Sequence, residues 1–355
     1  MSATPRVTVL MTVFNGERHL REAVDSVLRQ TFGDFELVIV DDGSTDGTAA
    51  LLAAISDPRV RVTRNDENLG LTPSLNRGLG LARGELIARH DADDVSEPER
   101  IARQIAFLDA HPDVALVGAW YRKIDDASAS LGERTLPVDH DRIRWALHFY
   151  CPIVHSAAVF RTSVVRELGG YDEAFVYAQD YDLWSRLATT RRVANVGEPL
   201  VRYRVGATTL TATIGDQSGE VLRIAARNMT ALGIATPSPA VHAAMGALVR
   251  GDASALTSAD FSVALDGVLL VLDRLRASGA LTDPRSLVND AACTIAGALA
   301  RQAGRLSDAD YGRALDRLRL TAPAVAEAMP GSRRWAALRG RFDRSRMARA
   351  MPWRS

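Results

Sequence analysis

The sequence predicts an α/β domain, with a mostly parallel sheet sandwiched by helices, followed by an all-helical C-terminal domain. Three observations support this fold class. Short β-rich runs alternate with amphipathic helical patterns in the first half, strand signals stop near residue 215, and every later segment has helical periodicity. We therefore expect two domains, residues 1–214 and 215–355, which also suits a chain of 355 residues.

In the first half, apolar runs of strand length are separated by segments with apolar residues every three or four positions. The run at 35–40 is almost continuously apolar, as expected for a central parallel strand. These patterns predict strands at 7–11, 35–40, 60–63, 85–89, 114–125, 157–160 and 200–203, and helices at 17–30, from 48, and at 72–82, 98–110 and 178–188. A polar hairpin or loop is expected at 126–134, and the later helices at 220–232, 240–249, 259–277, 286–303 and 309–318.

Composition excludes several classes of protein. The formal net charge is zero, which gives no reason to expect a nucleic-acid partner. Lys123 is the single lysine and lies outside any glycine loop, so the chain has no Walker phosphate loop. The glycines at 78–84 lack GxGxxG spacing and precede a strand, which makes hydride chemistry a poor interpretation.

The chain also lacks signs of secretion or membrane insertion. Cys151 and Cys293 are far apart, so we expect two buried thiols in a reducing compartment and neither a disulfide framework nor a zinc cluster. Residues 1–6 have no signal-peptide pattern, and acidic residues interrupt the most apolar later stretch, 261–275. The predicted location is the cytoplasm.

The most informative segment is 84–94, an apolar strand that ends in Asp91, Asp93 and Asp94. Crowded carboxylates repel each other, and a hard divalent cation relieves that repulsion. We therefore predict a nucleotide diphosphate bridged by Mg²⁺ or Mn²⁺ at this position. A solvated acidic loop is the alternative, because such a short motif recurs by chance.

Further polar residues follow the neighbouring predicted strands, and parallel strands bring their carboxyl ends to one crevice. Phe14 could form the wall of a base pocket, and Asp42 could accept hydrogen bonds from a base or ribose. Turn formation is the alternative explanation for each residue taken singly. The residues expected around this crevice are Thr12, Phe14 and Asn15 after the first strand, Asp41 and Asp42 after the second, and Gly70 and Asn76 before the fourth.

Taken together, these segments resemble family 2 glycosyltransferases of the GT-A fold, a Rossmann-like architecture. The resemblance covers roughly residues 7–204, and nothing beyond residue 215 contributes to it. The matching segments are 9–17 (VLMTVFNGE), 26–32 (SVLRQTF), 38–46 (VIVDDGSTD), 88–94 (ARHDADD), 168–173 (LGGYDE) and 179–184 (QDYDLW).

The resemblance implies inverting transfer of a sugar from a nucleotide diphosphate donor to a hydroxyl acceptor, as in the synthesis of cell-surface polysaccharides or glycoconjugates. A UDP-sugar is the default donor, with dTDP- and GDP-sugars as rivals. It also implies Asp91 and Asp93 as a DxD motif, with Asp93 and Asp94 as candidate ligands of Mn²⁺ or Mg²⁺. The candidate nucleotide-sugar-binding residues are Thr12, Phe14, Asn15, Glu17, Asp41, Asp42, Gly70, Asn76 and Asp91.

By the same resemblance Asp180 is the general base, although a carboxylate that simply favours a helix N-terminus is the alternative. Two departures from the family pattern concern the site. Gln179 replaces the usual Glu, and Gly206 and Ala207 follow Tyr203-Arg204-Val205 where relatives frequently carry a His. His155, Gln179 and Trp184 are candidates for the acceptor side, which a glycan or lipid-linked acceptor would occupy.

Two questions stay open from the sequence. Residues 331–355 hold eight arginines interleaved with apolar residues, so this segment either makes a peripheral membrane contact or packs on the helical domain. The second question concerns activity. The missing Glu and His suit a catalytically inactive nucleotide- or glycan-binding module acting through its helical domain, whereas Asp180 and the acidic cluster favour an enzyme.

Overall fold

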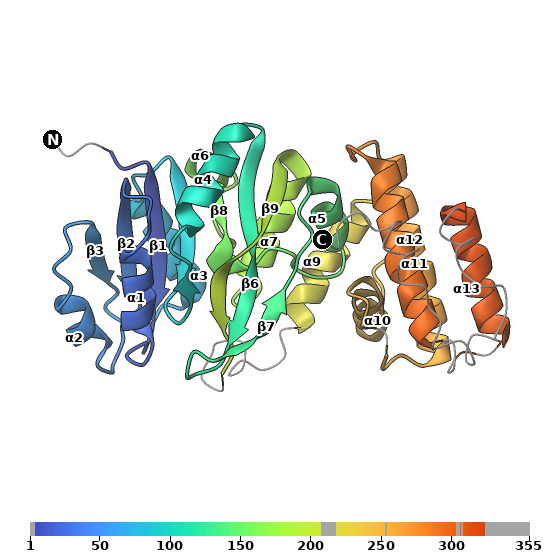
Figure 1. Ribbon diagram of the computed structural model, residues 1–355, viewed down its shortest axis with the longest axis horizontal. Coiled ribbons are helices and arrows are strands. Elements are labelled where there is room, and N and C mark those ends of the chain that lie inside the picture. The colour runs from blue at the N-terminus through green and yellow to red at the C-terminus, as the bar shows by residue number, and fades with distance from the viewer. Residues whose placement is uncertain (1–3, 207–217, 253, 303–305, 307, 324–355) are drawn as a thin grey trace. The chain divides into compact units, whose positions relative to one another are not determined.

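The computed structural model describes residues 4–206, 218–252, 254–302, 306 and 308–323 (Figure 1). The described residues form two compact units. The first contains residues up to Arg144 together with Cys151–Ile224, and the second contains Trp145–Tyr150 together with residues from Ala225 onward. The predicted boundary between residues 214 and 215 lies outside the described residues, as does the arginine-rich segment 331–355.

The first unit is built on one sheet. Its strand order is β3 (Val60–Arg64), β2 (Phe35–Asp41), β1 (Val7–Val13), β4 (Leu86–Asp91), β8 (Val159–Arg161), β6 (Val114–Ile124), β9 (Arg192–Arg204) and β5 (Val95–Ser96), with β7 (Ser130–Arg134) paired to β6. The first four strands in this order are parallel, whereas β8 runs antiparallel to both of its neighbours. The predicted α/β fold class is confirmed, with a mixed rather than a purely parallel sheet.

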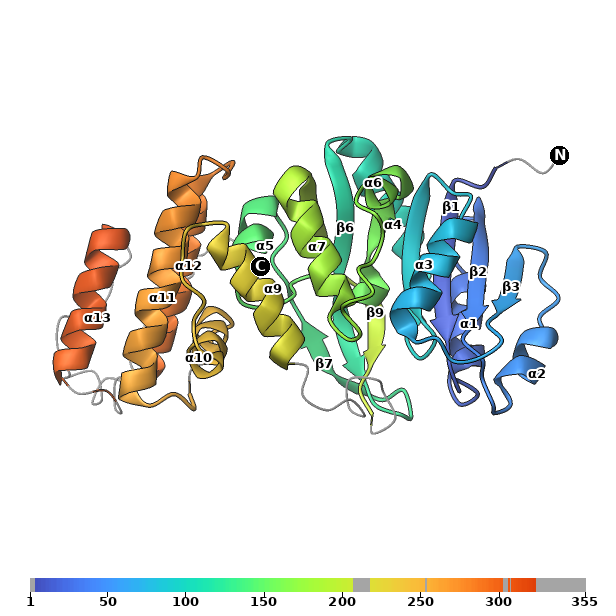
Figure 2. The ribbon, with the colours of Figure 1, turned by 180° about the vertical axis from the view of Figure 1, so that it is seen from behind.

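Helices cover both faces of this sheet. Figure 1 shows α1 and α4 in front of the strands, and the reverse view in Figure 2 brings α3, α6 and α7 to the front. The helices of this region are α1 (Leu20–Leu28), α2 (Thr48–Ala53), α3 (Leu71–Leu81), α4 (Arg100–Ala110), α5 (His140–Ala146), α6 (Thr162–Glu167) and α7 (Gln179–Thr190), with a 3₁₀ turn at His155–Ala157. The sequence patterns did not predict α5, α6 or β5, which are all short.

The apolar stripe of α1 shows how sequence pattern becomes packing. Leu20, Val24 and Val27 are at most 1% exposed and share a core with Val9 and Met11 of β1. Burying one such side chain contributes on the order of 1.5–3 kcal/mol. This packing fixes the start of α1 close to the end of β1, and hence the loop between them.

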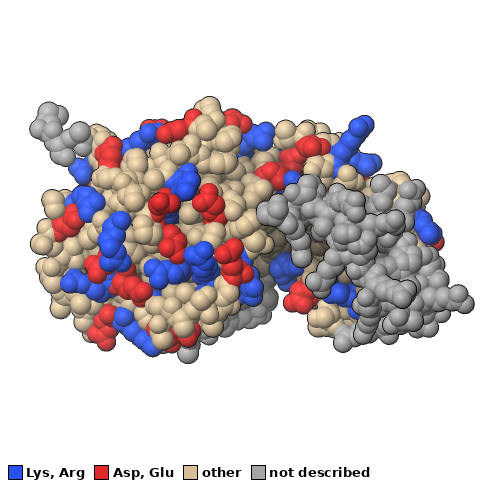
Figure 3. Space-filling view, viewed as in Figure 1, with Lys and Arg blue, Asp and Glu red and all other residues tan. Residues whose placement is uncertain are grey.

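The second unit is helical. It contains α10 (Pro239–Val249), α11 (Ser258–Ala277), α12 (Pro284–Gln302) and α13 (Asp308–Thr321), and α9 (Ser218–Thr230) contributes its residues from Ala225 onward. Phe261, Leu272 and Leu299 lie in its core. Among the described helices, none is both long enough and apolar enough to cross a bilayer. On the face drawn in Figure 3, acidic and basic side chains of the described residues are interspersed.

Candidate active site

The carboxyl ends of β2, β1 and β4 lie side by side. In the parallel register Thr12 pairs with Val40 on one side and with Asp91 on the other, and Val13 pairs with Asp41. Thr12 is buried, whereas Phe14, just beyond the end of β1, is 45% exposed. The edge therefore presents one open aromatic ring next to the carboxylates that follow β2 and β4.

Asn15 and Glu17 connect the loop after β1 to the loop after β2. The Asn15 side-chain oxygen accepts the backbone N–H of Thr45 at 2.8 Å, and Glu17 Oε2 accepts that of Gly47 at 2.7 Å. Asn15 itself has a positive φ of 51°, a conformation that asparagine tolerates better than most residues. Both exposed side chains hold the two loops together, and their contact with the nucleotide sugar stays a prediction.

The two carboxylates at the end of β2, Asp41 and Asp42, are buried and hydrogen-bonded. Asp41 accepts the backbone N–H of Ser44 at 3.0 Å and pairs with Arg64 at 2.8 Å. Asp42 accepts hydrogen bonds from the Asn65 side chain at 2.6 Å and from the backbone N–H groups of Leu69 and Gly70, both at 2.9 Å. The oxygens of Asp42 thus hold the segment before α3, and its hydrogen bond to a base or ribose stays a prediction.

Gly70 and Asn76 are likewise structural in this arrangement. Gly70 has φ of 95° at the start of α3, a left-handed conformation that glycine adopts without strain. Asn76 accepts the backbone N–H of Tyr171 at 3.0 Å and donates to its carbonyl at 2.9 Å. Asn76 thus attaches α3 to the segment leading to α7, which explains its side chain without a ligand.

The acidic residues Asp91 and Asp93 at the end of β4 are more exposed than Asp41 and Asp42. Arg89, fully buried, donates to Asp91 at 2.5 Å, and its remaining donors Nε and Nη1 have no hydrogen-bond partner. Burial, with the charge of Asp91 as the next cause, raises the pKa of Asp93 to about 6. Asp91 and Asp93 are both partly exposed and repel each other, and the charge of Arg89 offsets only part of this repulsion.

Asp94, in contrast, faces inward. It is 1% exposed and accepts the backbone N–H of Arg204 at 2.7 Å. Burial and the charges of Asp93 and Asp91 raise the pKa of Asp94 well above its usual range. Its Oδ2 has no hydrogen-bond partner among the described residues, but a carboxylate this deeply buried is less well placed than Asp91 and Asp93 to bind an ion at the surface, so its role as a metal ligand stays a prediction.

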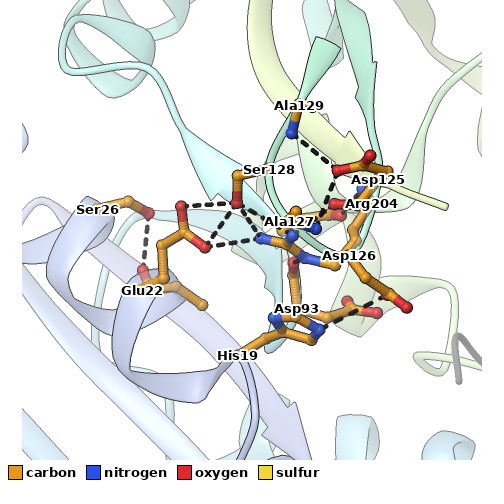
Figure 4. Close-up of polar contacts among 12 residues, drawn as sticks. His19, Glu22, Ser26, Asp93, Asp125, Asp126, Ala127, Ser128, Ala129 and Arg204 are labelled. Atoms are coloured by element: carbon orange, nitrogen blue, oxygen red, sulfur yellow. Dashed lines mark hydrogen bonds and ion pairs between the residues drawn. The ribbon is translucent and has the colours of Figure 1, made fainter. Parts of the chain in front are cut away.

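Arg204 of β9 contacts the acidic loop and its surroundings through several hydrogen bonds (Figure 4). Its Nε donates to the carbonyl of Asp93 at 2.8 Å, and its Nη2 pairs with Glu22 of α1 at 2.7 Å. It also donates to the carbonyl of Asp125 at 2.7 Å and to the Ser128 hydroxyl at 3.1 Å. A buried arginine so fully paired fixes the β4 end against α1 and the β6–β7 connection.

Asp180 lies much later in the sequence than the acidic loop, in the first turn of α7. Its Oδ1 accepts the N–H of Tyr181 at 2.7 Å, and the side chain is partly exposed. Burial raises the pKa of Asp180 to about 6, and the negative charge of Asp91 contributes to the same shift. The end of β4 and the start of α7 are therefore close enough for their carboxylates to interact.

The three acceptor-side candidates all lie inside the protein. Trp184 is 0% exposed and packs on Phe160 and His155, which makes it a core residue and corrects its predicted contact with an acceptor. His155 lies 3.0 Å from the Tyr171 hydroxyl, and burial holds its pKa well below the usual range. Gln179 is also buried, with its side-chain oxygen unpartnered.

Within the described residues, no group of three or more His, Cys, Asp or Glu side chains is arranged to hold a metal ion. The predicted clamp of three carboxylates is therefore not formed by the protein alone. Asp91 and Asp93 still suit a divalent cation, because Mg²⁺ is commonly held by one or two carboxylates together with substrate phosphates. The repulsion between these two groups is the property that a cation would relieve.

Sequence reasoning missed the arginines of the site. Arg89 and Arg204 both lie within strands, where a charged side chain among apolar neighbours has to find a partner if it is buried. That placement was the available signal, although it does not identify the partner. Glu22, which pairs with Arg204, carries no signal of its own because it looks like an ordinary polar residue of α1.

Comparison with known proteins gives consistent results. Residues 8–169 match the family model described as glycosyl transferase family 2. The chain is 31% identical over 242 residues, 65% of its length and 75% of the relative, to an uncharacterized glycosyltransferase of Haemophilus influenzae. It is 37% identical over 210 residues to the putative glycosyltransferase EpsE of Bacillus subtilis, covering 58% of this chain and 74% of EpsE.

Two further similarities extend this picture. The amylovoran biosynthesis glycosyltransferase AmsE of Erwinia amylovora is 32% identical over 206 residues, 56% of this chain and 76% of AmsE. Among solved structures, S. aureus TarS 1–349 in complex with UDP-GlcNAc is similar with a TM-score of 0.54 at 15% identity, covering 96% of this chain and 93% of that chain. At this level of identity the structural similarity concerns the fold alone.

Proposed function

Because the chain belongs to glycosyltransferase family 2, we propose that it transfers a sugar with inversion from a nucleotide diphosphate donor to an acceptor hydroxyl. A UDP-sugar is the first donor to consider, and the acceptor is a glycan or a lipid-linked glycan of cell-surface polysaccharide or glycoconjugate synthesis. The similarity to the amylovoran biosynthesis glycosyltransferase supports a biosynthetic role.

One observation carries the proposal: Asp180 is a partly exposed carboxylate whose pKa is raised to about 6, within electrostatic reach of Asp91. A general base needs a pKa near the working pH and access to the hydroxyl that it deprotonates. We place the donor diphosphate at Asp91 and Asp93, and the charge of Asp91 acts on Asp180 at the start of α7.

In the proposed reaction the acceptor oxygen attacks the anomeric carbon from the face opposite the diphosphate. The new C–O bond forms as the bond to the diphosphate oxygen breaks, and the hydroxyl proton passes to Asp180. The nucleotide diphosphate leaves with the bonding electron pair. Holding donor and acceptor in line supplies a large part of the rate, and no protein nucleophile is needed.

Asp91 and Asp93 are the residues that would hold Mn²⁺ or Mg²⁺ together with the donor phosphates. When bound, the cation offsets the negative charge that develops on the leaving diphosphate. Arg204 keeps the main chain of Asp93 in place through its 2.8 Å hydrogen bond. Phe14 is the open aromatic ring at the end of β1, and Thr12 lies beside Asp91 in the register, so these two residues form the proposed nucleoside side.

The direct test is release of UDP from UDP-GlcNAc with Mn²⁺, followed by dTDP- and GDP-sugars if the first donor is inert. Asp180→Asn keeps the size of the side chain and removes the base, so the rate of UDP release should fall about 10²- to 10⁴-fold while UDP affinity is kept. Asp109→Asn removes an exposed carboxylate that pairs with Arg6 and serves as the matched control. Binding of nucleotide without any turnover would instead favour the non-catalytic module.

A further inference from the structure

The segment that leads into α7, residues 174–178, is held by a residue from a different part of the chain. Glu220 of α9 accepts three consecutive backbone N–H groups: Val176 at 2.9 Å through Oε1, and Tyr177 at 2.9 Å and Ala178 at 2.8 Å through Oε2. Glu220 lies in the part of α9 that belongs to the first compact unit. One carboxylate therefore fixes three successive peptide units immediately before Gln179 and Asp180.

Packing alone does not hold this segment. Val176 and Tyr177 are 49% and 40% exposed, so their side chains bury little apolar surface. Phe175 is the buried anchor, and Arg223 of α9 stacks over its ring at 4.5 Å. Thr72 donates to the carbonyl of Phe175 and Arg223 to that of Ala174, both at 2.8 Å, and the three bonds to Glu220 hold the backbone N–H groups from there to the buried Ala178.

The start of α7 lacks a cap of its own. Ala178 occupies the N-cap position and has no side-chain oxygen to accept a backbone N–H of the first turn. Glu220 places a negative charge beside this helix end, where the helix dipole favours it. Burial works to raise the pKa of Glu220, but the three N–H bonds outweigh it, and the pKa is lowered overall. The carboxylate is therefore ionised at neutral pH.

We propose that Glu220 is a positioning residue for transfer: by holding residues 176–178 it sets the place of Asp180 at the start of α7. This inference rests on the proposed role of Asp180. Asp180 lies two residues after Ala178, the last of the three held residues. Greater backbone motion at 176–178 would therefore also displace the carboxylate of Asp180. Misplacement of a catalytic group by about 1 Å is enough to cost roughly 10²-fold in rate.

The test compares Glu220→Ala and Glu220→Gln with the wild type and with Glu167→Ala. Glu167 is an exposed carboxylate that pairs with Arg191, so its removal controls for loss of a surface charge. Amide hydrogen exchange of 174–182 reports the loop directly. The kcat and KM for UDP-GlcNAc hydrolysis with Mn²⁺, and the affinity for UDP, report the site; dTDP- and GDP-sugars replace UDP-GlcNAc if it is inert.

In Glu220→Ala, exchange at residues 176–178 should accelerate at least tenfold and kcat should fall at least tenfold, with donor KM and UDP affinity unchanged. Glu220→Gln keeps one acceptor oxygen and should recover part of both effects. Unchanged exchange in Glu220→Ala overturns the inference, and so does unchanged kcat when exchange has accelerated. A wild type without turnover on any of the donors would mean that the proposed function has failed, and this inference with it.

Discussion

The ends of β2 and β4 offer an instructive contrast, because both are parallel to β1 in the same mixed sheet and both end in aspartates. After β2, Asp41 and Asp42 are buried and accept hydrogen bonds from Arg64, Asn65 and backbone N–H groups. After β4, Asp91 and Asp93 are partly exposed, and their mutual repulsion helps to raise the pKa of Asp93. The carboxylates at the end of β2 are buried and hold the frame of the site, whereas Asp91, although paired with Arg89, and Asp93 are partly exposed and accessible to a ligand.

The sharpest test of this contrast is Asp93→Asn, for which we expect a loss of turnover of about 10²- to 10³-fold. Removing one of two repelling charges should leave the free energy of unfolding unchanged or slightly higher when no metal is present. Hydrolysis of the active donor with Mn²⁺ and urea unfolding in EDTA measure the two properties. Turnover within threefold of the wild type would contradict the assignment of this region to donor binding.

The reverse pattern is expected for Asp42→Ala. Loss of the carboxylate leaves the backbone N–H of Leu69 without its acceptor and frees the segment before α3, at a cost of about 2 kcal/mol in the free energy of unfolding. Urea unfolding checks this value, and Asp42→Asn, which keeps one acceptor oxygen, should lose less. If Asp42→Ala unfolds like the wild type but loses nucleotide affinity, Asp42 belongs to the binding residues after all.

The pH dependence of turnover should report the region around Asp91 and Asp180. The base acts as a carboxylate, and because its pKa is raised to about 6, activity should be full above that pH. Below it the protonated fraction grows, so kcat should fall about tenfold for each further pH unit. A pH–rate profile of donor hydrolysis measures this. A profile that stays flat down to pH 4.5 would remove Asp180 from the role of base.

We expect the smallest effect for Gly70→Ala, which changes the backbone conformation at a residue held by Asp42. Gly70 has φ of 95°, and a Cβ there would meet nothing closer than Pro73 at 4.0 Å, so Gly70→Ala is strained by conformation rather than by crowding. We expect a loss of about 1 kcal/mol, with turnover nearly unchanged. Urea unfolding would detect it, and a loss above about 3 kcal/mol would show that this turn carries more of the frame than its contacts suggest.

Much of the fold and part of the site could be predicted from the sequence. Strand and helix periodicities are local. The sequence therefore places Asp91 at the end of a strand and Asp180 near the start of a helix. The three candidates for the acceptor side fared worse: Trp184 is a core residue, and His155 and Gln179 are buried. A motif shows which residues are near a site along the chain, but not which way each side chain points.

The sequence by itself determined the α/β class, the helical second half, and the order of the acidic segments, because these depend on spacing along the chain. Only the tertiary structure decided the state of each carboxylate. Asp42 is satisfied by a loop more than twenty residues away, and Asp94 accepts a backbone N–H from Arg204, which is 110 residues further along the chain. Burial and charge partners are long-range properties, and they separate the residues that build the site from those that can act in it.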